Sequence, residues 1–68
     1  MYEVFVRYTH KPDREVRYLT EEEGITDAYY LGYKTLIRFE VYASYVIDLN
    51  PRHIISIRQN EITEKESK

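Results

Sequence analysis

The first twenty residues alternate between two kinds of side chain, as the strands of a hairpin do. Over residues 2–9, every second position is Tyr or Val, and the positions between them are mostly polar or charged. A period of two predicts a half-buried strand. His10-Lys11-Pro12-Asp13 favours a turn, because proline presets φ and aspartate hydrogen-bonds its own backbone. Residues 14–20 alternate again and predict the return strand.

The side chains of this predicted hairpin also favour one register. When Arg7 lies opposite Glu15, Phe5 lies opposite Arg17 on the outer face, and valines pair on the inner face. A register that sets Arg7 against Arg17 brings like charges together, which is unfavourable. A shift by one residue mixes the two faces of the sheet. We therefore expect the first of these registers.

The segment after the hairpin contains signals for both a helix and a loop. Thr20 followed by Glu23 has the form of a capping box, but Gly24 interrupts it at once. A second helix start at residues 26–27 leaves room for one or two turns that end near Gly32. The residues alone allow either a short helix or an ordered acidic loop.

The second half of the chain predicts three more strands and two breaks between them. We expect the strands at residues 34–43, 45–49 and 55–59. The first break, Ala43-Ser44, is either a tight turn or a bulge. The second break is Asn50-Pro51, because proline supplies no backbone donor, and a single turn follows it at residues 52–54.

These elements predict a mainly β fold: a small single-domain antiparallel sheet or a partly open five-stranded barrel, with one short helix or ordered loop. In outline, residues 34–58 resemble the SH3-like and Sm-like barrels, in which a short turn also precedes the last strand. We expect a β-rich domain over residues 1–59 and a flexible charged tail over residues 60–68. The predicted core consists of Val4, Val6, Val16, Ile37, Phe39, Val41, Ile47, Ile55 and Ile57.

The size of the chain favours association with something else. Chains below roughly 70–80 residues seldom obtain more than about 3–5 kcal/mol from a single core. This chain has 68 residues, no cysteine for a disulfide and only two histidines for a metal. Its outer face also carries apolar residues. We expect a homo-oligomer that covers this face or pairs an edge strand; the outward residues are Phe5, Leu19, Leu36 and Tyr42.

Motifs for catalysis and for membrane insertion are missing from the sequence. It contains no GxSxG, no phosphate-binding glycine loop and no histidine set beside a serine in a known arrangement. We therefore expect no enzyme, no cofactor and no metal site. No apolar run approaches the roughly 18 residues of a membrane span, and residues 1–20 lack a signal-peptide pattern. These features and the absence of cysteine favour a cytoplasmic protein.

The most unusual feature is the number of tyrosines, eight in all. Tyrosine suits half-buried strand positions, and Tyr29 and Tyr33 are in the right segment to cap an open barrel end. Tyrosine is also enriched at protein interfaces. We therefore predict a protein-binding module, an inhibitor or adaptor of phage type, that acts through an acidic tyrosine-rich surface. Its predicted partner-binding residues are Glu21, Glu22, Glu23, Asp27, Tyr29, Tyr30 and Tyr33.

Two other functions remain open at this point. Aromatic residues beside cations hold single-stranded nucleic acid on small barrels, and residues 34–58 contain four basic residues against two acidic ones. The candidate residues for that function are Arg38, Tyr42, Arg52 and Arg58. The formal net charge of −2 for the whole chain opposes it. The third possibility is a structural subunit of a larger assembly.

Overall fold

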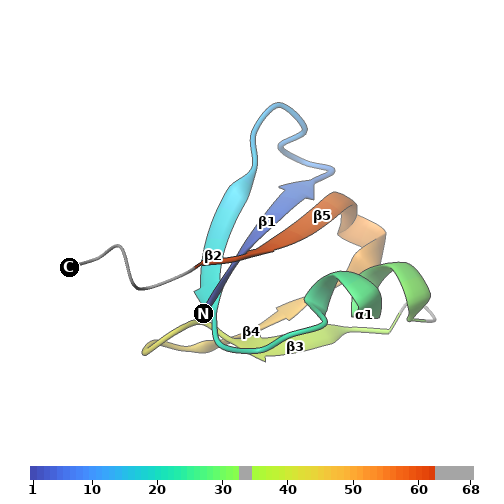
Figure 1. The fold of residues 1–68 in the computed structure, drawn as a ribbon. Coiled ribbons are helices and arrows are strands. Elements are labelled where there is room, and N and C mark those ends of the chain that lie inside the picture. Colours follow the sequence, from blue (N-terminus) through green and yellow to red (C-terminus); the bar gives the residue numbers. More distant parts are fainter. Residues whose placement is uncertain (33–34, 63–68) are drawn as a thin grey trace.

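The computed structural model describes residues 1–32 and 35–62, and they form the predicted mainly β fold. Two antiparallel sheets are present, with strand order β2-β1-β5 in one and β3-β4 in the other (Figure 1). The strands are β1 (Tyr2–Tyr8), β2 (Val16–Thr20), β3 (Ile37–Glu40), β4 (Val46–Leu49) and β5 (Ile54–Glu61). One backbone bond, from the Tyr42 N–H to the Leu19 carbonyl at 2.7 Å, links the β3–β4 hairpin to β2. The sheets do not close into a barrel.

The register of the β1–β2 hairpin is the predicted one. Phe5 lies opposite Arg17, and Val6 lies opposite Val16. The outer face therefore carries the charged pairs, among them Arg17 with Glu3 at 2.7 Å. The alternation of side chains and the pairing of unlike charges point to the same register, so the local sequence specifies it.

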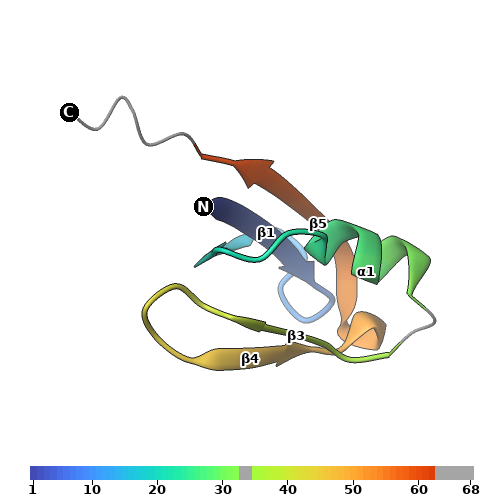
Figure 2. The same cartoon turned by 60° about the horizontal axis from the view of Figure 1, so that its bottom comes forward.

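The core lies between the two sheets, and the helix α1 (Ile25–Leu31) closes one side (Figure 2). Of the predicted core residues, Val16, Val41 and Ile47 are only half-buried. Sequence reasoning missed Ile25, Leu49 and Ile54. The buried apolar residues are Val4, Val6, Ile25, Ile37, Phe39, Leu49, Ile54 and Ile57.

The prediction that Ile55 points inward is wrong. Pairing between β1 and β5 shifts between Arg7, which faces Ser56, and Tyr8, which faces Ile54. Ile55 is the extra residue at this irregularity and is 48% exposed, whereas Ile54 is 5% exposed. A bulge inserts one residue into the strand, so Ile54 and Ile57 share the inner face although they are three positions apart.

Of the two possibilities for the segment after β2, the structure has the short helix. It begins at Ile25, directly after Gly24, whose φ of 77° places it in the left-handed region, and it ends at Gly32. The capping box does not form, because Thr20 is the last residue of β2. Its hydroxyl instead accepts a hydrogen bond from the Glu22 N–H at 3.2 Å.

The two breaks in the second half are both turns. At the first, Ala43 has a φ of 54° and the Ser44 N–H donates to the Val41 carbonyl at 2.9 Å, so this is a tight turn and not a bulge. At the second, Pro51–His53 form one turn of 3-10 helix, and the Asn50 side chain accepts from the Arg52 N–H at 3.0 Å. Strand β3 begins at Ile37, three residues later than predicted.

The last strand extends further than the one predicted at residues 55–59. Strand β5 continues to Glu61, which pairs with Tyr2, and the Ile62 N–H donates to the Met1 carbonyl at 2.9 Å. The predicted tail residues 63–68 lie outside the described residues.

Alkaline pH should destabilise the protein through Tyr8. Its hydroxyl lies 2.8 Å from the Tyr18 hydroxyl, and partial burial together with this hydrogen bond raises the pKa of Tyr8 above its ordinary value of 10.0. The folded state therefore holds the proton more tightly than the unfolded chain. Its stabilising effect is complete below about pH 10 and is lost as the pH rises further.

Urea denaturation between about pH 8 and about pH 11 tests this expectation. We expect the midpoint to fall above about pH 10, and to fall less steeply in Tyr8→Phe than in the parent protein. An equal slope for the two proteins would show that another group controls the alkaline limit.

Candidate protein-binding surface

Carboxylates gather at one end of the molecule. The connection between β2 and α1 exposes Glu21, Glu22 and Glu23, and Asp27 follows in the first turn of the helix. Two strands add to this group, since the Glu40 N–H donates to Oε2 of Glu22 at 3.4 Å and Glu61 ends β5. We call the group the acidic surface: Glu21, Glu22, Glu23, Asp27, Glu40 and Glu61. Within residues 1–32 and 35–62, none of them forms an ion pair.

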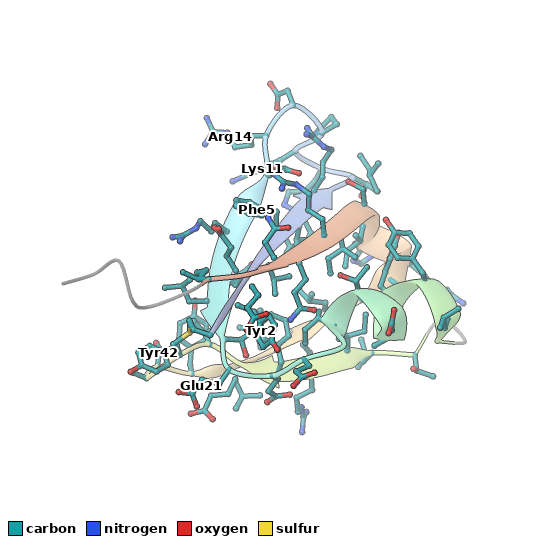
Figure 3. The ribbon with its side chains drawn as sticks, viewed as in Figure 1. Tyr2, Phe5, Lys11, Arg14, Glu21 and Tyr42 are labelled. Atoms are coloured by element: carbon teal, nitrogen blue, oxygen red, sulfur yellow. The ribbon has the colours of Figure 1, made fainter. Side chains whose placement is uncertain are left out.

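Two hollows in this surface each combine carboxylates with a tyrosine ring. The first, of about 130 Å³, is lined by Thr20, Glu21, Glu22, Glu40, Tyr42 and Ala43. The second, of about 360 Å³, is lined by Tyr2, Glu23, Gly24, Thr26, Asp27, Gln59 and Glu61. Figure 3 shows Glu21 and Tyr42 at one end of the molecule. Lys11 and Arg14 lie at the opposite end, in the β1–β2 turn. Rings and carboxylates together suit a cationic group.

The pKa of Tyr2 shows the electrostatic character of the second hollow. Burial, and next the negative charges of Glu23 and Glu61, raise the pKa of the Tyr2 hydroxyl above its ordinary value. Nearby negative charge disfavours the ionised phenol. A ligand bearing positive charge would therefore be favoured in this hollow.

Elsewhere on the described part of the chain, carboxylates on or beside the strands are neutralised by arginines. Glu15 lies 3.2 Å from Arg58, and Asp48 lies 2.7 Å from Arg38. These guanidinium groups lower the pKa of both carboxyl groups below their ordinary values, mainly through hydrogen bonds. Glu3, Glu15 and Asp48 are thus paired with arginines, while the carboxylates of the acidic surface are not.

Tyr29 and Tyr30, which the sequence assigned to the binding surface, lie against β5. The Tyr29 hydroxyl donates to the Ile54 carbonyl at 2.9 Å, and the Tyr30 hydroxyl donates to the Ile57 carbonyl at 3.3 Å. Their rings meet edge to face at 4.6 Å. They line a separate hollow of about 380 Å³, with Gly32, Pro51 and Arg52. Tyr33 lies outside the described residues.

The structure therefore divides the predicted site. It brings the predicted carboxylates together with Tyr2, Tyr42, Glu40 and Glu61, which sequence reasoning did not assign to this surface. One signal pointed to Tyr2: the hairpin register sets it opposite Thr20, at the strand end from which the acidic run departs. No local signal pointed to Glu40 or Glu61, because their positions depend on how the second sheet and β5 pack.

The residues predicted for nucleic-acid binding do not share a surface. Arg38 lies on the outer face of the β3–β4 sheet, where its Nε and Nη2 donate to Asp48 at 2.7 and 3.1 Å. Arg58 lies on the outer face of the other sheet, over the Phe5 ring at 4.2 Å. The core separates these faces. Arg52 belongs to the tyrosine-lined hollow, and Tyr42 lies among carboxylates.

Of the apolar residues predicted to point outward, Leu36 and Tyr42 are exposed, while Phe5 and Leu19 are half-buried. Arg58 covers part of the Phe5 ring. The exposed apolar area thus belongs mainly to the β3–β4 hairpin and its flanks. Self-association through this area stays a prediction.

Within the described residues, no three or more His, Cys, Asp or Glu side chains are placed so that they could hold one metal ion, and no helix is long and apolar enough to cross a membrane. Comparison with protein-family models, curated proteins and solved structures found no significant match.

Proposed function

We propose that this chain is a small non-enzymatic protein-binding module whose acidic surface binds a basic segment of another protein. One observation carries the proposal. The carboxylates of the acidic surface, contributed by the β2–α1 connection, β3 and β5, lie together without an ion pair among the described residues. By contrast, Glu3, Glu15 and Asp48, which lie on or beside other parts of the strands, each have an arginine partner.

Grouping like charges has a cost, because exposed carboxylates repel one another. A fold that groups six carboxylates at one end without an ion pair among the described residues therefore sacrifices some stability there. Complementary charge on a partner would remove this cost and speed the encounter between the two proteins. Tyr42, which is 49% exposed beside Glu21 and Glu40, supplies aromatic area for contact with the partner.

An inhibitor or an adaptor would use such a surface in the same way, by covering a basic site on a larger protein.

A peptide-binding assay tests the proposal. Fluorescein-labelled hexalysine, hexaglutamate and an oligothymidine of similar length are titrated with the protein at low salt, and binding is followed by fluorescence anisotropy. We expect hexalysine alone to bind, and added salt to weaken it, as it weakens contacts between exposed charges. A Glu21→Gln/Glu22→Gln/Glu23→Gln variant should bind about tenfold or more weakly, which corresponds to about 1.4 kcal/mol.

Two controls separate binding from folding and from net charge. The triple variant should unfold in urea at the same concentration as the parent protein or higher, because it removes repulsion. Asp13→Asn, in the exposed β1–β2 turn, and the single variant Glu23→Gln each remove one negative charge. Glu23→Gln should weaken binding, whereas Asp13→Asn should leave it unchanged. Equal binding by the triple variant would overturn the proposal, and binding of oligothymidine would favour the nucleic-acid alternative.

A further inference from the structure

Strand β5 forms a free edge of the three-stranded sheet, and α1 covers only the first part of it. The Tyr30 hydroxyl occupies both backbone groups of Ile57, donating to its carbonyl at 3.3 Å and accepting from its N–H at 3.5 Å. The Tyr29 hydroxyl occupies the Ile54 carbonyl at 2.9 Å. These two tyrosines therefore act as caps that satisfy edge groups which would otherwise be open.

Beyond Ile57 the same edge is open. In an antiparallel pair, successive residues direct their backbone groups alternately toward the partner strand and away from it. Ile57 faces α1, and the Ile62 N–H faces β1, where it donates to Met1. Gln59 and Glu61 therefore direct their N–H and carbonyl groups away from β1. No backbone partner of either residue is found among residues 1–32 and 35–62. The Gln59 carbonyl accepts a hydrogen bond from the side-chain amide of Asn60 at 3.3 Å, so the open groups are the Gln59 N–H and the N–H and carbonyl of Glu61.

The side chain of Gln59 connects this edge to the acidic surface. Its Oε1 accepts from the Ile25 N–H at 2.9 Å, and its Nε2 donates to the Glu22 carbonyl at 2.9 Å. These bonds hold the start of α1 beside the end of β5. The second hollow, with Glu23, Asp27 and Glu61 in its lining, therefore borders the open edge.

We propose that the edge of β5 at Gln59–Glu61 accepts an extended basic segment of a partner protein as an added strand. This inference rests on the proposed function and specifies its binding mode. The backbone of the segment bonds the Gln59 N–H and the N–H and carbonyl of Glu61, and alternate Lys or Arg side chains reach Glu23, Asp27 and Glu61. In such strand addition, backbone bonds supply affinity and alternate side chains supply specificity.

The charge at this edge argues against a second copy of the chain as the occupant. Antiparallel pairing of two β5 edges would bring Glu61 and its acidic neighbours from both copies into the same region. Like charges placed opposite each other across strands are destabilising. A basic segment would instead place positive charges beside these carboxylates, and this charge complementarity favours it as the occupant.

Two peptides with identical charge test the binding mode. The first is acetyl-Lys-Thr-Lys-Thr-Lys-amide, and the second is the same peptide with an N-methyl group on every internal backbone amide, so that neither of its edges can donate to a strand. We expect the methylated peptide to bind at least about tenfold more weakly, the equivalent of losing one or two hydrogen bonds. Amide hydrogen exchange should slow at Gln59 and Glu61 when the first peptide binds, and not with the second.

A matched pair of variants tests the same edge from the protein side. Glu61→Gln and Glu61→Pro remove the same charge, but only proline removes the N–H that points away from β1. Proline is tolerated at an edge position whose N–H is free. We expect Glu61→Pro to bind the unmethylated peptide about fivefold or more weakly than Glu61→Gln, with unchanged urea midpoints.

The outcomes separate this inference from the proposed function. Equal binding of the two peptides would overturn strand addition and leave the acidic surface as a purely electrostatic site. If hexalysine also fails to bind, the proposed function fails as well. If the amides of Gln59 and Glu61 are already protected without peptide, and light scattering gives a dimer mass, a second copy occupies the edge and the inference is overturned.

Discussion

Phe39→Ala should leave the protein largely unfolded. The Phe39 side chain is 1% exposed and connects the two sheets, because it lies on β3 and meets the Tyr18 ring of β2 edge to face at 6.0 Å. Truncation of a buried phenylalanine costs about 3–5 kcal/mol. A domain of this size obtains about as much in total from its core, so the loss approaches the whole stability.

Circular dichroism and urea denaturation measure this effect directly. Val46→Ala is the matched control, because Val46 lies on the same hairpin but is 57% exposed. Substitution there should change the free energy of unfolding by less than about 1 kcal/mol. A Phe39→Ala protein with near-parental unfolding would show that the β3–β4 sheet does not pack on the rest of the domain.

The neighbouring isoleucines at the start of β5 should respond very differently to the same change. Ile54→Ala removes a side chain that is 5% exposed and should cost about 2–5 kcal/mol. Ile55→Ala removes one that is 48% exposed, so its cost should stay within about 1 kcal/mol, the range of strand propensity. The difference arises because Ile55 is the extra residue of the irregularity opposite Arg7 and Tyr8.

Urea denaturation of the two single variants decides between the structure and the regular alternation of side chains. Regular alternation from Ile55 onward places Ile55 and Ile57 inward and makes Ile55→Ala the costly change. Equal losses for the two variants would contradict the observed register of β1 with β5.

The sequence alone determined the features that depend on neighbouring residues. The β1–β2 hairpin and its register follow from side-chain alternation and from the pairing of Phe5 with Arg17. Asn50-Pro51 produces its turn because proline cannot continue a ladder, and the mainly β class follows from several such segments. In each case the relevant contacts lie within a few residues or across one short turn.

The tertiary structure alone decided the features that depend on distant segments. The irregularity in β5 exists because the strand must pair with β1 and also bury Ile54 behind its 3-10 turn, and no local pattern encodes that conflict. Glu40 and Glu61 join Glu21–Glu23 only after β3 and β5 have packed around the β2–α1 connection. Tyr29 and Tyr30 cap an edge strand some 25 residues away, as in the Tyr29–Ile54 bond. Such contacts depend on which edges the folded sheets leave open, and alternation along a chain carries no information about them.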